Sequence, residues 1–95
     1  MKPIGTVIID EGALIALKKG SSLLPAGIIK VSGEFLRGDV VSVLSQENEK
    51  IGLGLAGYSS NDTNKIMGHK SNEIAEILNY SYREEFIHKD DLVLI

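Results

Sequence analysis

The sequence contains no cysteine and no tryptophan, and it has only two prolines. Without cysteine the chain can form no disulfide bond, no thiolate metal site and no cysteine nucleophile, and this composition suits a cytoplasmic protein. No apolar run approaches the length of a membrane span, and no apolar signal core follows the N-terminus. We therefore expect a cytoplasmic protein that has no membrane partner.

Positive charge is also scarce. The 10 lysines and arginines are outnumbered by 13 aspartates and glutamates, which gives a net charge of -3 at pH 7. This balance excludes a surface that is basic all over, which is the usual electrostatic signature of nucleic-acid binding. The balance does not exclude a small basic patch.

No catalytic or metal-binding pattern is legible. His69 has no partner nearby in the sequence, and the acidic residues around His88 are typical of a strand end in water. Two isolated histidines support no Ser/His/Asp arrangement, and no pair of carboxylates lies in an identifiable cleft. We predict that these 95 residues hold no catalytic residue and no metal site.

A glycine pattern at 52–57, Gly-x-Gly-x-x-Gly, matches the dinucleotide-binding fingerprint. That fingerprint requires a strand before it and a helix at its end. Here the glycines alternate with Leu53 and Leu55 inside a predicted strand. The pattern therefore predicts a strand with a bare face, against which another backbone can lie closely, and it predicts no cofactor.

The stretch 10–20 predicts a helix with both ends defined. Asp10 can cap the first turn, Lys18 and Lys19 suit the last turn, and Gly20 can take the left-handed position after it. The apolar run 13–17 is wider than one helix face, so we expect this helix to be enclosed on most sides.

The loop after this helix contains Leu23 and Leu24, and we expect this pair to fill the core. Ser59 predicts the start of a short helix that Gly68 ends, and apolar spacing predicts another helix over 74–78. Strands are predicted at 5–9, 28–31, 40–44, 50–57, 86–87 and 92–95. Residues 1–95 are therefore expected to form a single domain that is mainly β, with short helices and mixed strands in a small barrel.

One local cluster combines positive charge with hydroxyl groups. It consists of Lys18, Lys19, Ser21 and Ser22, to which Lys30 can be added. The interpretation we favour is a helix C-terminus complemented by lysines. The alternative is a phosphate-contacting edge beside a loop that offers backbone amides.

Several stretches in order resemble the PUA domain, a module of pseudouridine synthases and archaeosine transglycosylases. They are DEGA at 10–13, GSSLLPAGI at 20–28, GEF at 33–35 and GDVV at 38–41. The resemblance implies a pseudobarrel of mixed strands with the first helix packed across it. In RNA-modifying relatives the first helix, the loop after it and the last strand meet RNA. By position, this implies the RNA-binding candidates Lys18, Lys19, Gly20, Ser21, Ser22 and Lys89.

More narrowly, SLLPAG at 22–27, YSS at 58–60 and FIHKDDLVL at 86–94 resemble the C-terminal PUA domain of the glutamate 5-kinase family. Gly57 departs from that pattern, which has asparagine there. The family phosphorylates glutamate with ATP and Mg²⁺ in an N-terminal amino-acid kinase domain, the first step of proline biosynthesis. The resemblance implies that this kinase domain is the partner, in a homo-oligomer, and that residues 1–5 are an interdomain junction or an artificial end.

Three hypotheses remain open at this point. The first is a non-catalytic accessory domain that acts in assembly and feedback regulation of the kinase. The second is an RNA-binding PUA module, which the acidic net charge of -3 disfavours. The third is a stand-alone PUA protein without a kinase domain.

Overall fold

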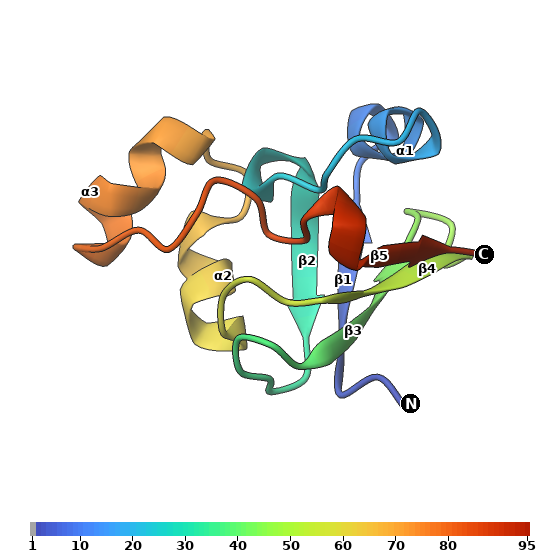
Figure 1. Ribbon diagram of the computed structural model, residues 1–95, viewed down its shortest axis with the longest axis horizontal. Helices are drawn as coiled ribbons and strands as arrows, with labels where there is room; N and C mark the ends of the chain where they lie inside the picture. The colour runs from blue at the N-terminus through green and yellow to red at the C-terminus, as the bar shows by residue number, and fades with distance from the viewer. Residues whose placement is uncertain (1) are drawn as a thin grey trace.

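The computed structural model describes residues 2–95, which form one five-stranded mixed β-sheet (Figure 1). The strands are β1 (Gly5–Ile9), β2 (Ile28–Ser32), β3 (Val40–Leu44), β4 (Lys50–Leu55) and β5 (Leu92–Leu94). Their spatial order is β2-β1-β3-β4-β5, with β1 and β3 parallel and the other neighbours antiparallel. This arrangement confirms the predicted mainly β fold of mixed strands. Met1, part of the expected junction at 1–5, lies outside the described residues.

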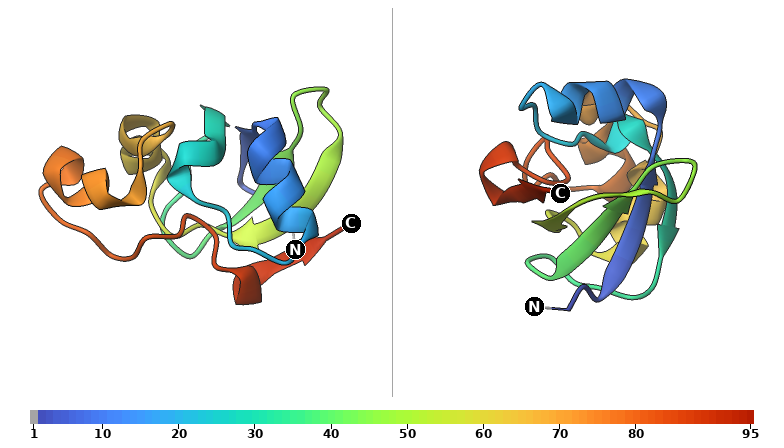
Figure 2. Two further views of the ribbon diagram at one scale, coloured as in Figure 1. Left: turned by 90° about the horizontal axis from the view of Figure 1, so that it is seen from above. Right: turned by 90° about the vertical axis from the view of Figure 1, so that its right-hand side faces the viewer.

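Three short α-helices and three 3-10 turns connect the strands. The helices are α1 (Glu11–Lys18), α2 (Ser60–Ile66) and α3 (Ile74–Leu78), and the turns are η1 (Pro25–Gly27), η2 (Ser71–Glu73) and η3 (Lys89–Asp91). In the right-hand view of Figure 2, β1, β3 and β4 lie towards the viewer, α1 lies above them and α2 lies behind. The helices therefore leave one face of the sheet uncovered.

Helix α1 begins and ends as the sequence predicts. The Asp10 carboxylate accepts a hydrogen bond from the Ala13 N–H at 2.8 Å, and Gly20 has a φ of +91° directly after the helix. The expected enclosure of α1 is wrong, because Leu17 is its only buried residue and Ile15 is 47% exposed. With only 8 residues, α1 packs on the protein along one side: Ala13 and Leu14 are partly buried against the core, and Ile15 faces solvent.

Only one leucine of the expected pair fills the core. Leu23 is 1% exposed, whereas Leu24 is 44% exposed, so the prediction for Leu24 is wrong. The backbone at Leu24 is extended, with φ -98° and ψ 151°. On extended backbone successive side chains point in opposite directions, so two adjacent leucines cannot both enter the core.

The strand predicted at 86–87 is also wrong. Ile87 forms only an isolated bridge with Leu23, in which the Leu23 N–H donates to the Ile87 carbonyl oxygen at 2.9 Å. Pro25 begins η1 on one side of this bridge and Lys89 begins η3 on the other. Because both segments turn away after one pair, the ladder cannot extend.

The bare face of β4 lies against the C-terminal segment, as expected from its glycines. A Cβ atom on Gly52 would lie 2.5 Å from the Val93 carbonyl oxygen, and one on Gly54 would lie 2.6 Å from Ile87 Cγ2. Strand β5 pairs with β4 in this region, with Gly52 opposite Leu94 and Gly54 opposite Leu92. These glycines therefore permit close packing of β4 against the C-terminal segment.

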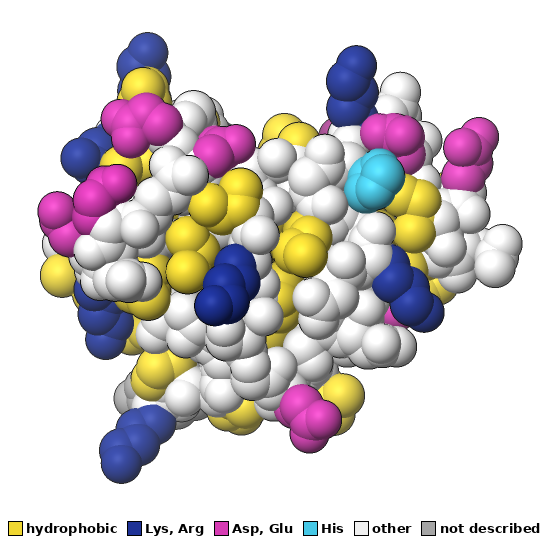
Figure 3. Space-filling view, turned by 180° about the vertical axis from the view of Figure 1, so that it is seen from behind, with side chains coloured by type: hydrophobic (Ala, Val, Ile, Leu, Met, Phe, Trp, Pro, Cys, Tyr) yellow, Lys and Arg dark blue, Asp and Glu magenta, His cyan; other side chains and the backbone are white. Residues whose placement is uncertain are grey.

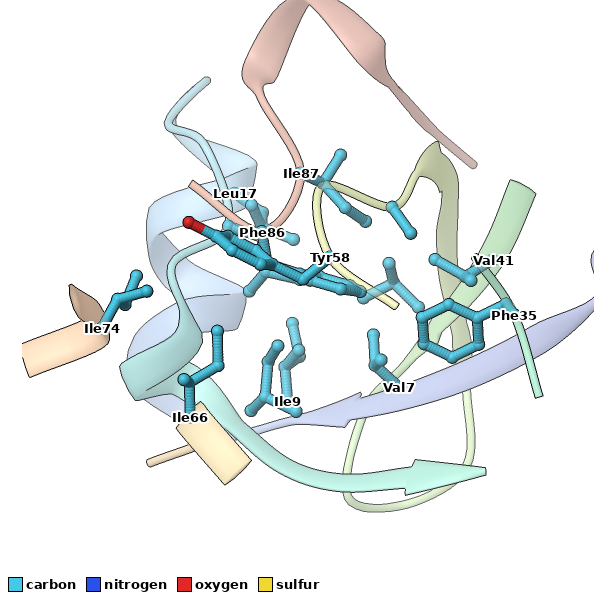
Figure 4. Packing of buried hydrophobic residues seen from close by; sticks show 14 residues of the cluster. Val7, Ile9, Leu17, Phe35, Val41, Tyr58, Ile66, Ile74, Phe86 and Ile87 are labelled. Atoms are coloured by element: carbon cyan, nitrogen blue, oxygen red, sulfur yellow. The ribbon is translucent and has the colours of Figure 1, made fainter. Parts of the chain in front are cut away.

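The core lies between the sheet and the helices, and Tyr58 crosses its centre (Figure 4). The Tyr58 side chain is 1% exposed, and its hydroxyl group donates to the Arg83 carbonyl oxygen at 2.6 Å. The Tyr58 hydroxyl oxygen in turn accepts hydrogen bonds from the Tyr82 N–H at 2.9 Å and the Arg83 N–H at 3.0 Å. Tyr58 thus fixes the irregular segment that follows α3.

Candidate functional site

The RNA-binding candidates from the first half of the chain lie where α1 ends. Lys18 is the last residue of α1, and the Lys19 N–H donates to the carbonyl oxygens of Ile15 and Ala16 at 3.2 and 3.1 Å. A Cβ atom on Gly20 would meet nothing within 4 Å, so its positive φ alone favours glycine there. Lysines at the carbonyl end of a helix complement its dipole, which supports the interpretation we favour from the sequence.

The candidate from the last part of the chain lies beside this loop. The Lys89 N–H donates to Ser22 Oγ at 2.8 Å, although the two residues are 67 positions apart. The neighbouring bridge between Leu23 and Ile87 holds the same two segments together. The structure therefore brings the loop after α1 and η3 into direct contact.

A shallow hollow lies between α1 and the segment 21–27. Ala13, Ala16 and Leu24 are among its apolar lining residues, and Ser21 and Ser22 supply hydroxyl groups; the remaining lining residues are Asp10, Gly12, Ala26 and Gly27. The one charged residue that lines it is acidic and already caps α1. A phosphate group in this hollow would meet a carboxylate and no lysine, so any contact with Lys18 or Lys19 would lie outside it.

The charges around η3 weaken an anion site further. Lys89 is followed by Asp90 and Asp91, and Arg83 Nη1 lies 3.6 Å from Asp91 Oδ2. Figure 3 shows the side of the molecule opposite to that of Figure 1, and there too basic and acidic side chains are interspersed and form no continuous basic area. An extended nucleic-acid backbone finds no broad attractive field on that face.

Sequence reasoning missed a cluster of tyrosine and arginine side chains after α3. The Arg37 guanidinium carbon lies 4.1 Å from the ring centroid of Tyr82, and that of Arg83 lies 5.5 Å from it. The Tyr80 hydroxyl donates to the Asp62 carboxylate, and this hydrogen bond together with burial raises the pKa of Tyr80 to about 12. The pattern Tyr-x-Tyr-Arg at 80–83 is the feature of the sequence from which this cluster could have been noticed.

The two histidines take part in local contacts. His69 Nδ1 lies 3.7 Å from Glu73 Oε2, and His88 Nδ1 accepts the Asp90 N–H at 3.1 Å. Within residues 2–95, no three His, Cys, Asp or Glu side chains gather as a metal ion would require. Over the same part of the chain, no helix has the length and apolarity to span a membrane.

Comparison with known proteins shows the family to which the chain belongs. The PUA domain family model matches residues 5–78. A PUA domain of known structure from Aeropyrum pernix K1, solved as a tartrate complex, superimposes with a TM-score of 0.67 at 30% sequence identity, over 90% of this chain and 41% of that one. The chain belongs to the PUA domain family.

Two curated relatives show which kind of PUA-containing protein the chain is similar to. The chain is 49% identical over 94 residues to the glutamate 5-kinase of Brucella anthropi and 53% identical over 94 residues to that of Paramagnetospirillum magneticum. In both cases the match covers 99% of this chain and 25% of the relative. The chain thus spans about a quarter of the length of these kinases, and it matches their C-terminal PUA part.

Proposed function

We propose that the chain is the non-catalytic C-terminal domain of a glutamate 5-kinase and that it acts there in assembly and feedback regulation. The observation that carries this proposal is the identity of 49% and 53% to two such kinases over 99% of the chain. In this proposal ATP, Mg²⁺ and glutamate bind to the amino-acid kinase domain, and the chain itself holds no cofactor. The full-length protein is a cytoplasmic homo-oligomer that carries out the first step of proline biosynthesis.

The polar side chains of the chain support an accessory role because many of them already stabilise the fold. Asp10 caps α1, Ser59 caps α2 by accepting the Asp62 N–H, and Asp62 itself accepts from Tyr80. Ser60 Oγ accepts the Phe35 N–H at 3.1 Å. Groups that hold their own backbone in place are poorly suited to act on a substrate.

The test uses a full-length chimera in which this chain replaces the C-terminal quarter of the Paramagnetospirillum magneticum kinase, beside the same kinase without that quarter. Molar mass by light scattering reports assembly, and ATP-dependent phosphorylation of glutamate across a proline series reports feedback. We expect the chimera to keep the mass and the proline response of the natural kinase and the shortened protein to lose at least one of them. A shortened kinase that keeps both would contradict the proposal.

A second candidate function is RNA binding. The contact between Ser22 and Lys89 favours it, because it joins candidates from both ends of the chain into one surface with Lys18, Lys19, Gly20 and Ser21. The acidic Asp10 in the adjoining hollow and the net charge of -3 oppose it. Binding of a labelled hairpin RNA, followed by fluorescence anisotropy across a salt series, distinguishes the two functions.

A further inference from the structure

One face of the sheet carries aliphatic side chains that point away from the core. On β1 and β3, the residues Val7, Val41 and Val43 are fully buried, so the residues that alternate with them point to the opposite side. We call this opposite side the outer sheet face, and it comprises Thr6, Ile8, Val40, Ser42, Leu44, Leu53, Leu55 and Val93.

The strand register brings these residues into rows. Ile8 pairs with Leu44, and Val40 pairs with Leu55. Leu53 lies between Ser42 on β3 and Val93 on β5. Apart from the small hydroxyl residues Thr6 and Ser42, these members are aliphatic. The register also places Lys30 opposite Ile8 and Lys50 opposite Leu44, so two lysines border the outer sheet face.

In the part of the chain that the structure describes, the outer sheet face is exposed at Leu55 and Val93; its other members are half-buried, apart from Ser42, which is 7% exposed. Val93 is 67% exposed and Leu55 is 39% exposed. The right-hand view of Figure 2 looks onto β1, β3 and β4 with no helix in front of them. A contiguous apolar area of this kind on a soluble domain marks an interaction site more often than chance exposure does.

The N-terminal end of the described chain lies at the edge of this face. The Ile4 N–H donates to the Val40 carbonyl oxygen at 2.8 Å, so residue 4 continues the line of β1 beside β3. Ile4 is itself 55% exposed. In the related kinases this domain is the C-terminal quarter, so the other three quarters of the polypeptide are joined at this end.

This covalent connection indicates what binds to the outer sheet face. A covalent tether that begins beside Val40 gives the preceding part of the polypeptide a high effective concentration at the outer sheet face. Lys30 and Lys50 at its border supply little positive charge for a phosphate backbone, whereas the aliphatic members resemble the buried centres of protein interfaces, which are apolar. Its border suits such an interface, because Leu55 also lines a hollow that contains Arg37 and Tyr82, residue types enriched at interfaces.

We infer that the outer sheet face is the surface on which the amino-acid kinase part of the same polypeptide docks. This inference rests on the proposed function, since it requires a kinase part upstream. The RNA-binding candidates lie where α1 ends, in the loop that follows it, and in η3. These segments remain accessible when the kinase part is docked.

Single-cysteine variants test the inference cleanly because the chain has no cysteine of its own. Val93→Cys and Leu55→Cys place a thiol on the outer sheet face. Ile15→Cys and Leu24→Cys are matched controls away from it, with exposures of 47% and 44% against 39% for Leu55. Each variant is made in the isolated chain and in the chimera described above, and maleimide labelling at each site is followed by peptide mass spectrometry.

In the isolated chain we expect all four thiols to react readily. In the chimera, a docked state that outweighs the undocked state ten to one should slow labelling at positions 93 and 55 about tenfold and leave positions 15 and 24 unchanged. Circular dichroism verifies that each variant is folded. The two positions on the outer sheet face are independent, so one unfolded variant does not remove the test.

Equal labelling rates at positions 93 and 55 in the chimera and the isolated chain would overturn the inference. Protection that develops in the isolated chain as its concentration rises would also overturn it, because a second copy would then occupy the face. These results are distinct from failure of the proposed function, which would show as unchanged mass and proline response on removal of the domain. A domain can dock without regulating, or regulate from another surface.

Discussion

The substitution Leu23→Ala is expected to destabilise the protein far more than Leu24→Ala, although the two leucines are adjacent. Leu23 is 1% exposed and belongs to the core cluster, whereas Leu24 is 44% exposed and lines the hollow beside α1. Truncation of a fully buried leucine removes its transfer free energy and leaves a cavity, which together cost about 2–5 kcal/mol. Truncation of an exposed side chain changes stability by about 0.5 kcal/mol.

The expected shift in urea follows from these values. A chain of 95 residues has a free energy of unfolding of about 5–14 kcal/mol, so Leu23→Ala removes a large part of it. With an m value of about 1.5 kcal/mol/M, a loss of 2–5 kcal/mol lowers the urea midpoint by about 1.3–3.3 M. The backbone hydrogen bond from Leu23 to Ile87 does not depend on the side chain, so the loss reports packing.

Urea unfolding of both variants, followed by far-ultraviolet circular dichroism, measures the two midpoints against wild type. Leu23→Val removes less volume and provides a second measurement if the alanine variant is unfolded in water, with an expected cost of about 1 kcal/mol. Equal midpoints for Leu23→Ala and Leu24→Ala would refute the assignment of Leu23 as the buried member of the pair. A larger effect at Leu24 would refute it as well.

Three further predictions follow from the site and the core. Tyr58→Phe should cost about 1–3 kcal/mol in urea unfolding, because it leaves partly buried backbone groups of the segment after α3 without their hydroxyl partner; an unchanged midpoint would contradict this. Tyr80 should ionise near pH 12 by tyrosinate absorbance, and Asp62→Asn should bring its pKa back towards 10.0. The pKa of Tyr80 is higher in the folded chain than in the unfolded chain. Its contribution to stability is therefore complete below pH 10 and is lost as the pH rises through 12. Ionisation near pH 10 in the native protein would contradict the hydrogen bond to Asp62. Finally, we expect little RNA binding at physiological salt, and if binding occurs at low salt, the double change Lys18→Glu and Lys19→Glu should reduce the log–log salt slope by about two on a helical duplex. Submicromolar binding at physiological salt that the double change abolishes would establish RNA recognition instead.

The parts of the fold that the sequence predicts correctly depend on local signals. The cap at Asp10, the left-handed Gly20 and the cap at Ser59 each involve residues a few positions apart, and all three are confirmed. The strands at 5–9 and 40–44 are also confirmed at both ends, because β-branched runs bounded by caps or turns define them.

The errors arise where distant segments decide the outcome. Whether Leu23 or Leu24 enters the core depends on the bridge to Ile87, which is more than sixty residues away. The same bridge explains why 86–87 forms no strand. The partners of Tyr58 and Tyr80 likewise come from segments far along the chain, so the tyrosine and arginine cluster could be noticed in the sequence without its contacts being predicted.

The size of the native protein that carries this sequence tests the central claim most directly. An antibody raised against the 95-residue chain identifies that protein in extracts of the organism that encodes it. The account predicts a polypeptide about four times as long as the chain, in line with a match to 25% of its relatives, whose immunoprecipitate phosphorylates glutamate with ATP and is inhibited by proline. A polypeptide no larger than the chain itself, without this activity, would contradict the account.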